Sequence, residues 1–378
     1  MDLLEYQGKQ LFARHGVPVP DGRHAATVDA AADAADEIGY PCVVKAQVAI
    51  GGRGKAGGIR LARDQVEARA HSEVILGMDI RGFTVHDLWV EQASEIDAEY
   101  YASVILDRSA KKLLAIVSRM GGMDVEEVAA SDPDALVKRQ IEPDTGLTPE
   151  LAQELAIDAG IDEDVTDQVA ATLVKLADVA VAEDATLIEV NPLIVTKDRE
   201  VVALDSKVTI DGNSLFRHPE LAELRDRSAE DPQERLAKEK GLTYVKLNGN
   251  IGVLANGAGL CMSTLDVVAQ AGGKPANFLD AGGGSKSEAI VDALQVITSD
   301  EKVTAILFNI FGGITRCDEI AKGIVEASQR IEISAPLVVR LDGTNSEEGL
   351  RILAEADLSN LHLQKTMLGG AEKVVELA

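Results

Sequence analysis

A short apolar run that leads directly into a glycine turn and a helix is the feature that most constrains how this chain folds. The stretch Ile251–Asp266 reads IGVLANGAGLCMSTLD, which predicts a buried strand, a turn at Asn256–Gly259 and a helix beginning near Leu260. A helix that begins in a glycine turn presents free backbone N–H groups and a positive dipole end, and both favour anions. We therefore expect the turn to receive a phosphate or a carboxylate. Tight packing of an ordinary β–α turn is the alternative.

Two familiar nucleotide motifs do not describe this turn. No Gly-Lys-Ser/Thr follows it, so it is not a Walker loop, and Met262 stands where a dinucleotide fingerprint has its third glycine. The turn also lacks a Ser-His or Cys-His pair. The anion must therefore be delivered by another group.

The same strand, turn and helix pattern recurs through the C-terminal part. Its predicted strands are Ile251–Ala255, Ala276–Leu279, Val303–Ile310 and Pro336–Leu341, and turns containing glycine follow each of them. Strands that alternate with helices predict a parallel sheet covered on both faces. In a flavodoxin-like strand order the first and third strands are neighbours, and ligands bind beyond their carboxyl ends. This order places Asn256–Gly259 beside Gly312–Thr315 and favours an anion site over simple packing.

The N-terminal part has a different pattern, with a mixture of helices and antiparallel strands. The predicted helices are Leu3–His15, Val28–Ile38, Asp64–Leu76 and Thr148–Ala182, the last broken at Gly160, and the predicted strands are Pro41–Val48, Thr84–Glu91, Tyr100–Leu106, Leu113–Ser118, Thr186–Val195 and Val201–Asp205. We expect Met120–Asp144 to be irregular and the polar stretch Asp211–Gly241 to be a linker. The predicted domains are residues 1–238 and 239–378.

Composition excludes several classes of protein. A net charge of −26 argues against nucleic acid as a partner. Three cysteines without a CxxC or Cys/His cluster indicate neither a disulfide framework nor zinc, and they fit a reducing cytoplasm. No apolar run approaches the roughly 18 residues that a membrane span needs, and the N-terminus MDLLEYQGKQ is not a signal peptide.

A cationic, glycine-rich loop stands out in this acidic chain. Residues 41–63 contain no Asp or Glu, and their cations are Lys45, Arg53, Lys55, Arg60 and Arg63. Five glycines lie between Gly51 and Gly58, where the backbone can approach a ligand closely. We predict that this loop covers phosphates and that Lys45 contacts them as a point charge. A solvated basic hairpin is the alternative.

Three oxygen-bearing side chains suggest a magnesium site. Glu189 and Asn191 are two apart on a predicted strand and so face the same side, and Asp205 ends the strand that pairs with it. Carboxylate and amide oxygens, completed by phosphate and water, are typical ligands of Mg²⁺. A turn-capping role for Asp205 is the alternative.

The six histidines are predicted to be structural or solvated, because none is expected to lie in a glycine turn or beside a paired acid. They are His15, His24, His71, His86, His218 and His362.

Several motifs together resemble one known family, the β subunits of succinate–CoA ligase. They are LLEYQGKQLFARHGVPVP, GGRGKAGG, LIEVNPL, LDSKV, DGNSLFR, NGAGL, NFLDAGGG and NIFGGITRCD, and their order covers nearly the whole chain. The resemblance implies an α/β protein with an N-terminal ATP-grasp region and a flavodoxin-like parallel-sheet CoA-ligase domain. It also implies a separate α subunit as partner, which carries a phosphohistidine and most of the CoA site.

The resemblance assigns roles to individual positions. Implied nucleotide contacts are Lys45, Gly52, Arg53, Gly54, Glu91, Ser94 and Glu99. Implied Mg²⁺ ligands are Asn191 and Asp205, and Glu189 is the acid that meets the partner's phosphohistidine. Implied substrate-binding residues are Asn256, Gly313, Ile314 and Thr315.

The implied reaction is succinyl-CoA + phosphate + ADP ⇌ succinate + CoA + ATP, through succinyl phosphate and the phosphohistidine. Pro20 resembles relatives that use adenine nucleotides. Two departures from the family pattern are the hydroxyl of Thr315 and the absence of an acid in Arg119–Met123. Thr315 keeps a hydroxy acid such as malate open as substrate. Malate- or acetate-type ligase subunits and a non-catalytic nucleotide-binding scaffold are therefore the alternatives.

The net charge of −26 generates a prediction about salt. Self-repulsion destabilises a compact acidic chain, and molar salt shortens the Debye length from about 8 Å to about 3 Å. We expect the fluorescence of Trp89, the only tryptophan, to report a higher unfolding midpoint in about 2 M than in about 0.1 M KCl. Equal midpoints would show a merely acidic protein with no adaptation to a high-salt cytoplasm.

Overall fold

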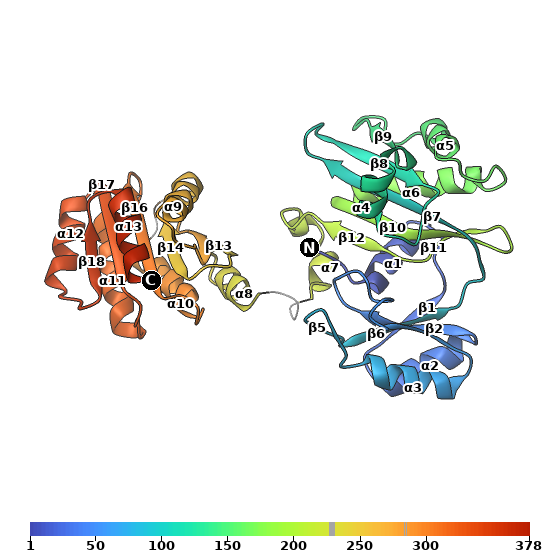
Figure 1. Ribbon diagram of the computed structural model, residues 1–378, viewed down its shortest axis with the longest axis horizontal. Helices are drawn as coiled ribbons and strands as arrows, with labels where there is room; N and C mark the ends of the chain where they lie inside the picture. The colour runs from blue at the N-terminus through green and yellow to red at the C-terminus, as the bar shows by residue number, and fades with distance from the viewer. Residues whose placement is uncertain (227–230, 283, 285) are drawn as a thin grey trace. The chain divides into compact units, whose positions relative to one another are not determined.

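The computed structural model describes residues 1–226, 231–282, 284 and 286–378, and the chain forms two compact units, Met1–Ala229 and Glu230–Ala378 (Figure 1). The division precedes α8 (Pro232–Glu239), whereas the predicted boundary at 238/239 falls within this helix. Because α8 packs against β13 (Thr243–Lys246) and α10 (Ser287–Thr298), it belongs to the second unit rather than to a linker. The part of the predicted linker at 227–230 lies outside the described residues.

The first unit begins with a small antiparallel sheet. Its strand order is β1 (Gly22–Ala25), β6 (Asp87–Gln92), β2 (Cys42–Gln47) and β3 (Ile59–Ala62). Helices α2 (Val28–Ile38) and α3 (Gln65–Ile75) pack against it, and apolar residues of β2 and β6 form their common core. The predicted strand Thr84–Glu91 is divided between β6 and the short hairpin β4 (Asp79–Ile80) and β5 (Phe83–Thr84).

The larger sheet of the first unit is also antiparallel. Its order is β11 (Val201–Ala203), β10 (Ala185–Thr196), β7 (Ile96–Asp107), β8 (Lys112–Ser118) and β9 (Val137–Ile141), and β12 (Lys207–Ile210) pairs with β10 as well. Its core includes residues of α1 (Glu5–Arg14), α5 (Pro149–Asp158) and α6 (Thr166–Ala182). The predicted break at Gly160 is confirmed, because that glycine adopts φ +70° between α5 and α6.

The prediction that Met120–Asp144 is irregular was wrong. This stretch contains α4 (Val125–Ser131), the 3₁₀ turn η1 (Pro133–Ala135) and β9. Asp124 caps α4 by accepting from the backbone N–H groups of Glu126 and Glu127. The acid-capped helix is too short for a periodic apolar signal, which explains why the pattern missed it.

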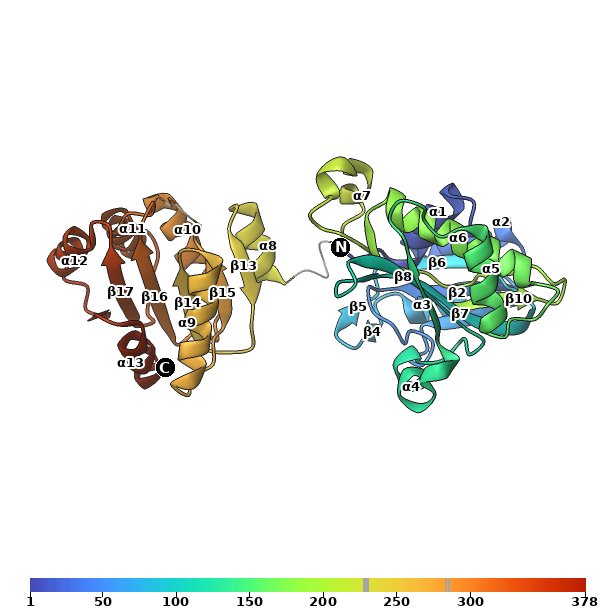
Figure 2. The same ribbon diagram turned by 90° about the horizontal axis from the view of Figure 1, so that it is seen from above.

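The second unit has the predicted flavodoxin-like order. The sheet runs β13, β15 (Asn277–Asp280), β14 (Ile251–Ala255), β16 (Ala305–Gly312), β17 (Leu337–Gly343) and β18 (Leu361–Gln364), parallel from β15 onward. One face packs on α9 (Ala258–Gln270) and α13 (Met367–Leu377), and the other on α10, α11 (Cys317–Arg330) and α12 (Ser346–Glu355) (Figure 2). Among the described residues, no helix is long and apolar enough to cross a membrane.

Candidate functional site

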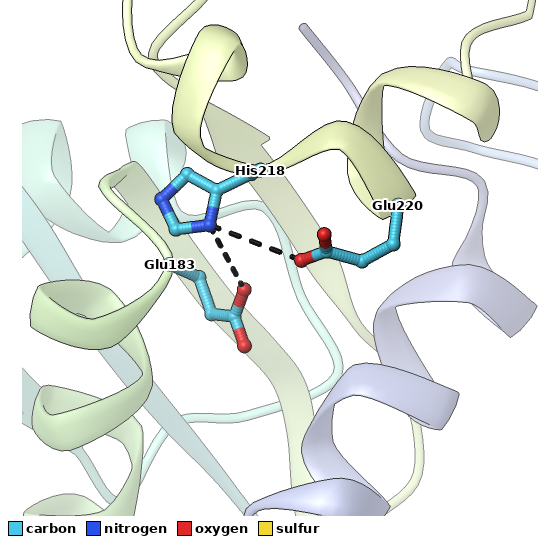
Figure 3. A group of neighbouring side chains, drawn as sticks. All are labelled: Glu183, His218 and Glu220. Carbon is cyan, nitrogen blue, oxygen red and sulfur yellow. Dashed lines mark ion pairs between the residues drawn. The ribbon is translucent and has the colours of Figure 1, made fainter.

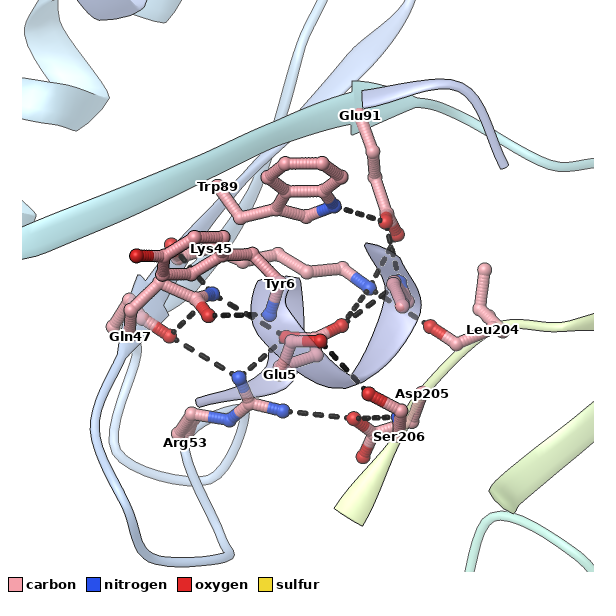
Figure 4. A network of polar contacts seen from close by, with 12 residues as sticks. Glu5, Tyr6, Lys45, Gln47, Arg53, Trp89, Glu91, Leu204, Asp205 and Ser206 are labelled. Atoms are coloured by element: carbon pink, nitrogen blue, oxygen red, sulfur yellow. Dashed lines mark hydrogen bonds and ion pairs between the residues drawn. The ribbon is translucent and has the colours of Figure 1, made fainter. Parts of the chain in front are cut away.

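A buried group of charges lies where α1, β2 and β6 meet the segment between β11 and β12 (Figure 4). We call these six residues the charge cluster: Lys9, Lys45, Arg53, Glu5, Glu91 and Asp205. Three side chains are cationic and three are anionic, so the cluster is neutral overall. Buried charges persist only when they are paired and hydrogen-bonded, which this arrangement achieves.

Glu5 is the acid that touches all three cations. Its carboxylate lies 2.9 Å from the Lys9 ammonium and 3.0 Å from that of Lys45, and it also pairs with the Arg53 guanidinium. Burial alone would raise the pKa of Glu5, but the charges of Arg53, Lys45 and Lys9 hold it well below its usual value. Glu5 is therefore a fixed carboxylate at the centre of the cluster.

Lys45 is held in place by this cluster rather than projecting into solvent. Its ammonium pairs with Glu5 and Glu91 and donates to the carbonyl of Leu204 at 3.1 Å. Burial alone would lower the pKa of Lys45, but the two carboxylates raise it above its usual value. These three partners occupy all three N–H donors of the ammonium, so the predicted contact with phosphates requires that one of the partners be exchanged for a phosphate oxygen.

Glu91 has a different environment from the one predicted for a base contact. Its fully buried carboxylate pairs with Lys45, lies 2.5 Å from Lys9 and accepts from the Trp89 indole N–H at 2.8 Å. The carboxylate is therefore not open to a nucleotide base. Beside it is a cavity of about 350 Å³, lined by Trp89, Lys9, Pro20 and their neighbours.

The glycine-rich loop is anchored at Arg53, which is only 8% exposed. Its guanidinium pairs with Glu5, donates to the Ala46 carbonyl at 3.2 Å and contacts Asp205 at 3.0 Å. Gly52 adopts φ +83°, a conformation that favours glycine, and Gly54 is exposed at the loop tip. The exposed tip is compatible with the predicted covering of phosphates. The alternative, a solvated basic hairpin, does not describe Arg53, because its side chain is buried.

The predicted metal ligands come from neighbouring segments. The N–H of Leu204 donates to the carbonyl of Pro192 at 3.2 Å, which brings Asp205 next to Asn191. The Asp205 Oδ1 atom accepts from Arg53 and from the Ser206 N–H at 2.8 Å, whereas Oδ2 accepts no hydrogen bond from the described residues. These oxygens fit the ligand preference of Mg²⁺.

The side chain of Asn191 also anchors a glycine turn. Its Oδ1 accepts from the Gly122 N–H and its Nδ2 donates to the Met123 carbonyl, both at 2.8 Å. The amide oxygen has a second lone pair for a further ligand. A Cβ atom added at Gly122 would lie 2.6 Å from the Glu99 carboxylate. Glu99 therefore lies against the glycine turn that Asn191 anchors. Ser94 lies between β6 and β7, outside the charge cluster.

Glu189 lies on the same face of β10 as Asn191, as predicted, with buried Val190 between them. It accepts from the Tyr101 hydroxyl at 3.4 Å and is in register with Lys207 of β12. Burial raises the pKa of Glu189, and Lys207 and Tyr101 partly counteract the shift. A poorly solvated carboxylate next to a cation site is suited to meet a cationic imidazole.

In the second unit, polar side chains tie the predicted anion turns together. Asn256 both donates to the Phe311 carbonyl at 2.8 Å and accepts from its N–H at 2.9 Å. Asp280 accepts from the N–H groups of Gly257 at 2.6 Å and Gly282 at 2.8 Å. The prediction that Asn256 lies beside the β16 turn is therefore confirmed. The predicted turn Asp280–Gly284 includes Gly283, which lies outside the described residues.

The three remaining predicted substrate residues differ in exposure. Gly313 and Ile314 are exposed, Ile314 by 87%, whereas Thr315 is buried. The Thr315 hydroxyl accepts from the Gly284 N–H at 3.1 Å and so connects two turns. This contact weakens the argument that Thr315 selects a hydroxy acid.

Three histidines pair with acids, which the sequence analysis did not predict. His15 lies 2.7 Å from Glu183, and His218 lies 2.7 Å from Asp184. Figure 3 shows His218 with its two further acidic neighbours, Glu183 and Glu220. His24 lies 2.7 Å from Asp87. Within the described residues, Glu183, His218 and Glu220 are also the one group with metal-compatible spacing. Because His15, Glu183 and His218 sit at the ends of α1, α6 and α7 (Pro219–Glu223), we assign this group a structural role at a helix junction.

Sequence reasoning missed Glu5 and Lys9 altogether. They are four residues apart on α1, a spacing typical of an exposed helix pair, yet each side chain is only 1% exposed. The one signal in the sequence was that both residues lie within LLEYQGKQ, a motif that we used to recognise the family but not to assign a site.

Comparisons with known proteins agree with both units. Residues 2–195 match the ATP-grasp domain family and residues 254–373 match the CoA-ligase family. The ADP-forming succinate–CoA ligase β subunit of Rubrobacter xylanophilus is 50% identical over 378 residues, covering 100% of this chain and 99% of the relative. Those of Halorubrum lacusprofundi and Natronomonas pharaonis are each 50% identical over 379 residues, with the same coverage.

A solved structure supports the fold. ATP citrate lyase from Methanothrix soehngenii aligns with a TM-score of 0.74 over 99% of both chains, at 18% identity. Identity this low shows likeness of fold alone. The full-length identity to the curated relatives shows more, and with both family matches it establishes that the chain belongs to the ADP-forming succinate–CoA ligase β subunits.

Proposed function

We propose that this chain binds Mg·nucleotide and succinate and couples the interconversion of succinyl-CoA and succinate to phosphorylation of ADP. The partner is an α subunit that carries a phosphohistidine and most of the CoA site. The observation that carries the proposal is the contact of Arg53 with Asp205, since Lys45 shares Glu5 with Arg53 and the segment of Asp205 pairs with the strand that bears Asn191. Family membership makes the reaction that of the named relatives.

Nucleotide binding is assigned to the first unit. Lys45 and the backbone of Gly52–Gly54 contact the phosphates, and Asn191 and Asp205 hold Mg²⁺, which neutralises charge on the transferred phosphoryl group when bound. The cavity lined by Pro20 and Trp89 receives the base, and Ser94 and Glu99 contact it or the ribose. Because its carboxylate is paired, Glu91 contacts the base through its backbone.

Acyl and phosphoryl binding is assigned to the second unit. Asn256 fixes the end of β16, and Gly313–Thr315 offer N–H groups at the start of α11 to an anion. Glu189 meets the partner's phosphohistidine at the nucleotide site and orients its imidazole. Because the Thr315 hydroxyl is buried and bonded to Gly284, it gives no reason to prefer a hydroxy acid to succinate.

Exchange of one metal-ligand carboxylate tests the nucleotide site. Asp205→Asn keeps the side-chain size but removes its charge, so we expect phosphoryl transfer to ADP, assayed with an α subunit, to fall at least about 100-fold. Because the exchange also removes one of the three acids that balance the buried cations, the thermal midpoint should fall, and activity is therefore assayed well below it. The control is Asp198→Asn in the exposed turn after β10, which retains activity. Comparable turnover in both variants would contradict the assignment.

The raised pKa of Glu189 predicts that neutralising this side chain increases stability while it abolishes activity. Burial raises this pKa, so the folded chain binds the proton more tightly than the unfolded one, and stability falls as pH rises through the window between the two values. Glu189→Gln should therefore have a higher thermal midpoint than the unchanged chain near pH 7.5, a gain that shrinks toward pH of about 4, and should lose phosphoryl transfer. Exposed Glu200→Gln is the control, without such a gain. A lower midpoint for Glu189→Gln at neutral pH would refute the prediction.

Dependence on the partner yields a third prediction. Among the described residues, no histidine hydrogen-bonds to the charge cluster or to the glycine turns of the second unit, and His24, which stacks on Tyr6, pairs with Asp87 instead. A covalent carrier is therefore expected from outside this chain. The purified chain should bind Mg·ADP without ligating CoA, and addition of an α subunit should restore ligation. Incubation with γ-labelled ATP should label the partner's histidine. Acid-labile label on this chain, or CoA ligation by this chain alone, would overturn the proposal.

A further inference from the structure

We propose that Glu5 is a positioning residue that keeps Arg53 away from the metal-binding carboxylate of Asp205 when Mg·nucleotide binds. This inference rests on the proposed nucleotide site. Glu5 belongs to none of the groups assigned above to nucleotide, metal or substrate. Glu5 nevertheless pairs with Lys45 and Arg53, so the positions of these two proposed nucleotide contacts depend on it.

Arg53 is shared between two carboxylates in this structure. Nη1 contacts Glu5 and Nη2 contacts Asp205 at 3.0 Å (Figure 4). The two acceptors differ in environment: the Glu5 side chain is 1% exposed, whereas that of Asp205 is 35% exposed. Asp205 can therefore turn toward a metal ion at the surface of the cluster, while Glu5 keeps the guanidinium in place.

Charge balance explains why nucleotide binding is favoured when Asp205 leaves Arg53 and turns to Mg²⁺. The cluster has three cations and three acids, and its neutrality is complete before any ligand binds. Once Asp205 is committed to Mg²⁺, the three cations are opposed by Glu5 and Glu91 alone, which leaves one positive charge to face the phosphates. A phosphate group can then contact Arg53, which Asp205 has released, together with the neighbouring ammonium of Lys45.

Glu5 itself is held by several neighbours, so it is suited to this role. It is the first residue of α1, where the helix dipole stabilises a carboxylate. Its backbone carbonyl accepts from the Ser206 hydroxyl at 2.8 Å, and Gln47 approaches its carboxylate at 3.4 Å. Without Glu5, the remaining carboxylate contact of Arg53 is Asp205, and the guanidinium then competes directly with the metal ion.

The test is a charge-balanced double variant, Glu5→Gln with Lys9→Met, which leaves two cations and two acids in the cluster. Trp89 lines the adjacent cavity and donates to Glu91, so its fluorescence reports binding without the partner or turnover. Mg²⁺ is titrated at a fixed, saturating ADP concentration. We expect the half-saturating Mg²⁺ concentration of the double variant to rise at least about 10-fold, which corresponds to about 1.4 kcal/mol.

Two controls separate this effect from general damage to the cluster. At saturating ADP, Lys9→Met alone keeps Glu5 on Arg53 and leaves one acid in excess, so its Mg²⁺ midpoint should not rise, although Lys9 lines the adjacent cavity. Ser206→Ala removes a hydrogen bond to the backbone of Glu5 without changing a charge, and its midpoint should stay near that of the unchanged chain. A purely structural role for Glu5 would lower the thermal midpoint without this selective loss of Mg²⁺ affinity.

Each outcome decides between the two proposals. If the unchanged chain gives no response to Mg·ADP, the nucleotide site itself is wrong. If it responds and the folded double variant has the same Mg²⁺ midpoint, the inference about Glu5 is overturned. If circular dichroism shows that the double variant does not fold, Glu5→Asp is titrated instead. This variant keeps the charge but withdraws it by one methylene, and an unshifted midpoint there also overturns the inference.

Discussion

The first unit depends on the burial of three cations against three carboxylates at one point. Lys9, Lys45 and Arg53 come from a helix, a strand and a loop, and Glu5 contacts all of them. Loss of one partner would leave an uncompensated buried charge, which is strongly destabilising. The cluster therefore joins α1 to the small sheet through the same side chains that are proposed to bind phosphates. Stability and ligand binding share these residues, so substitutions at the core of the cluster must preserve its balance of charge.

The second unit instead positions its turns through hydrogen bonds between side chains and the backbone. Its parallel strand order brings β14 and β16 together, and Asn256 connects their ends through two hydrogen bonds to Phe311. Asp280 and Thr315 bind the backbone of neighbouring turns. These bonds fix the turn geometry before a ligand arrives, which limits the ordering cost of binding. Helix N-termini then supply attraction for an anion without a buried charge.

The sequence predicted the second unit more completely than the first. Regular alternation of strands and glycine turns determines a parallel order, and that order alone placed Asn256 beside the turn after β16. The antiparallel first unit offers no such rule, because the pairing of its strands depends on side-chain packing between distant segments. The contact of Arg53 with Asp205 joins residues 152 apart in the chain, and residue spacing carries no signal for it. Glu5 and Lys9 were missed for the same reason: their spacing predicts an exposed helix pair, and only the tertiary structure buries it.

The burial of Glu5 and Lys9 within a neutral cluster bears on where the net negative charge of the chain lies. The whole net charge of −26 lies outside the cluster, because the cluster itself is balanced. Salt therefore screens repulsion between exposed acids without weakening the buried pairs to the same degree. Two of the compared relatives come from halophiles, which is the setting where such a division is useful. An acidic surface keeps the protein soluble in concentrated salt, and a sequestered, neutral cluster keeps the cations of the nucleotide site in place under the same conditions.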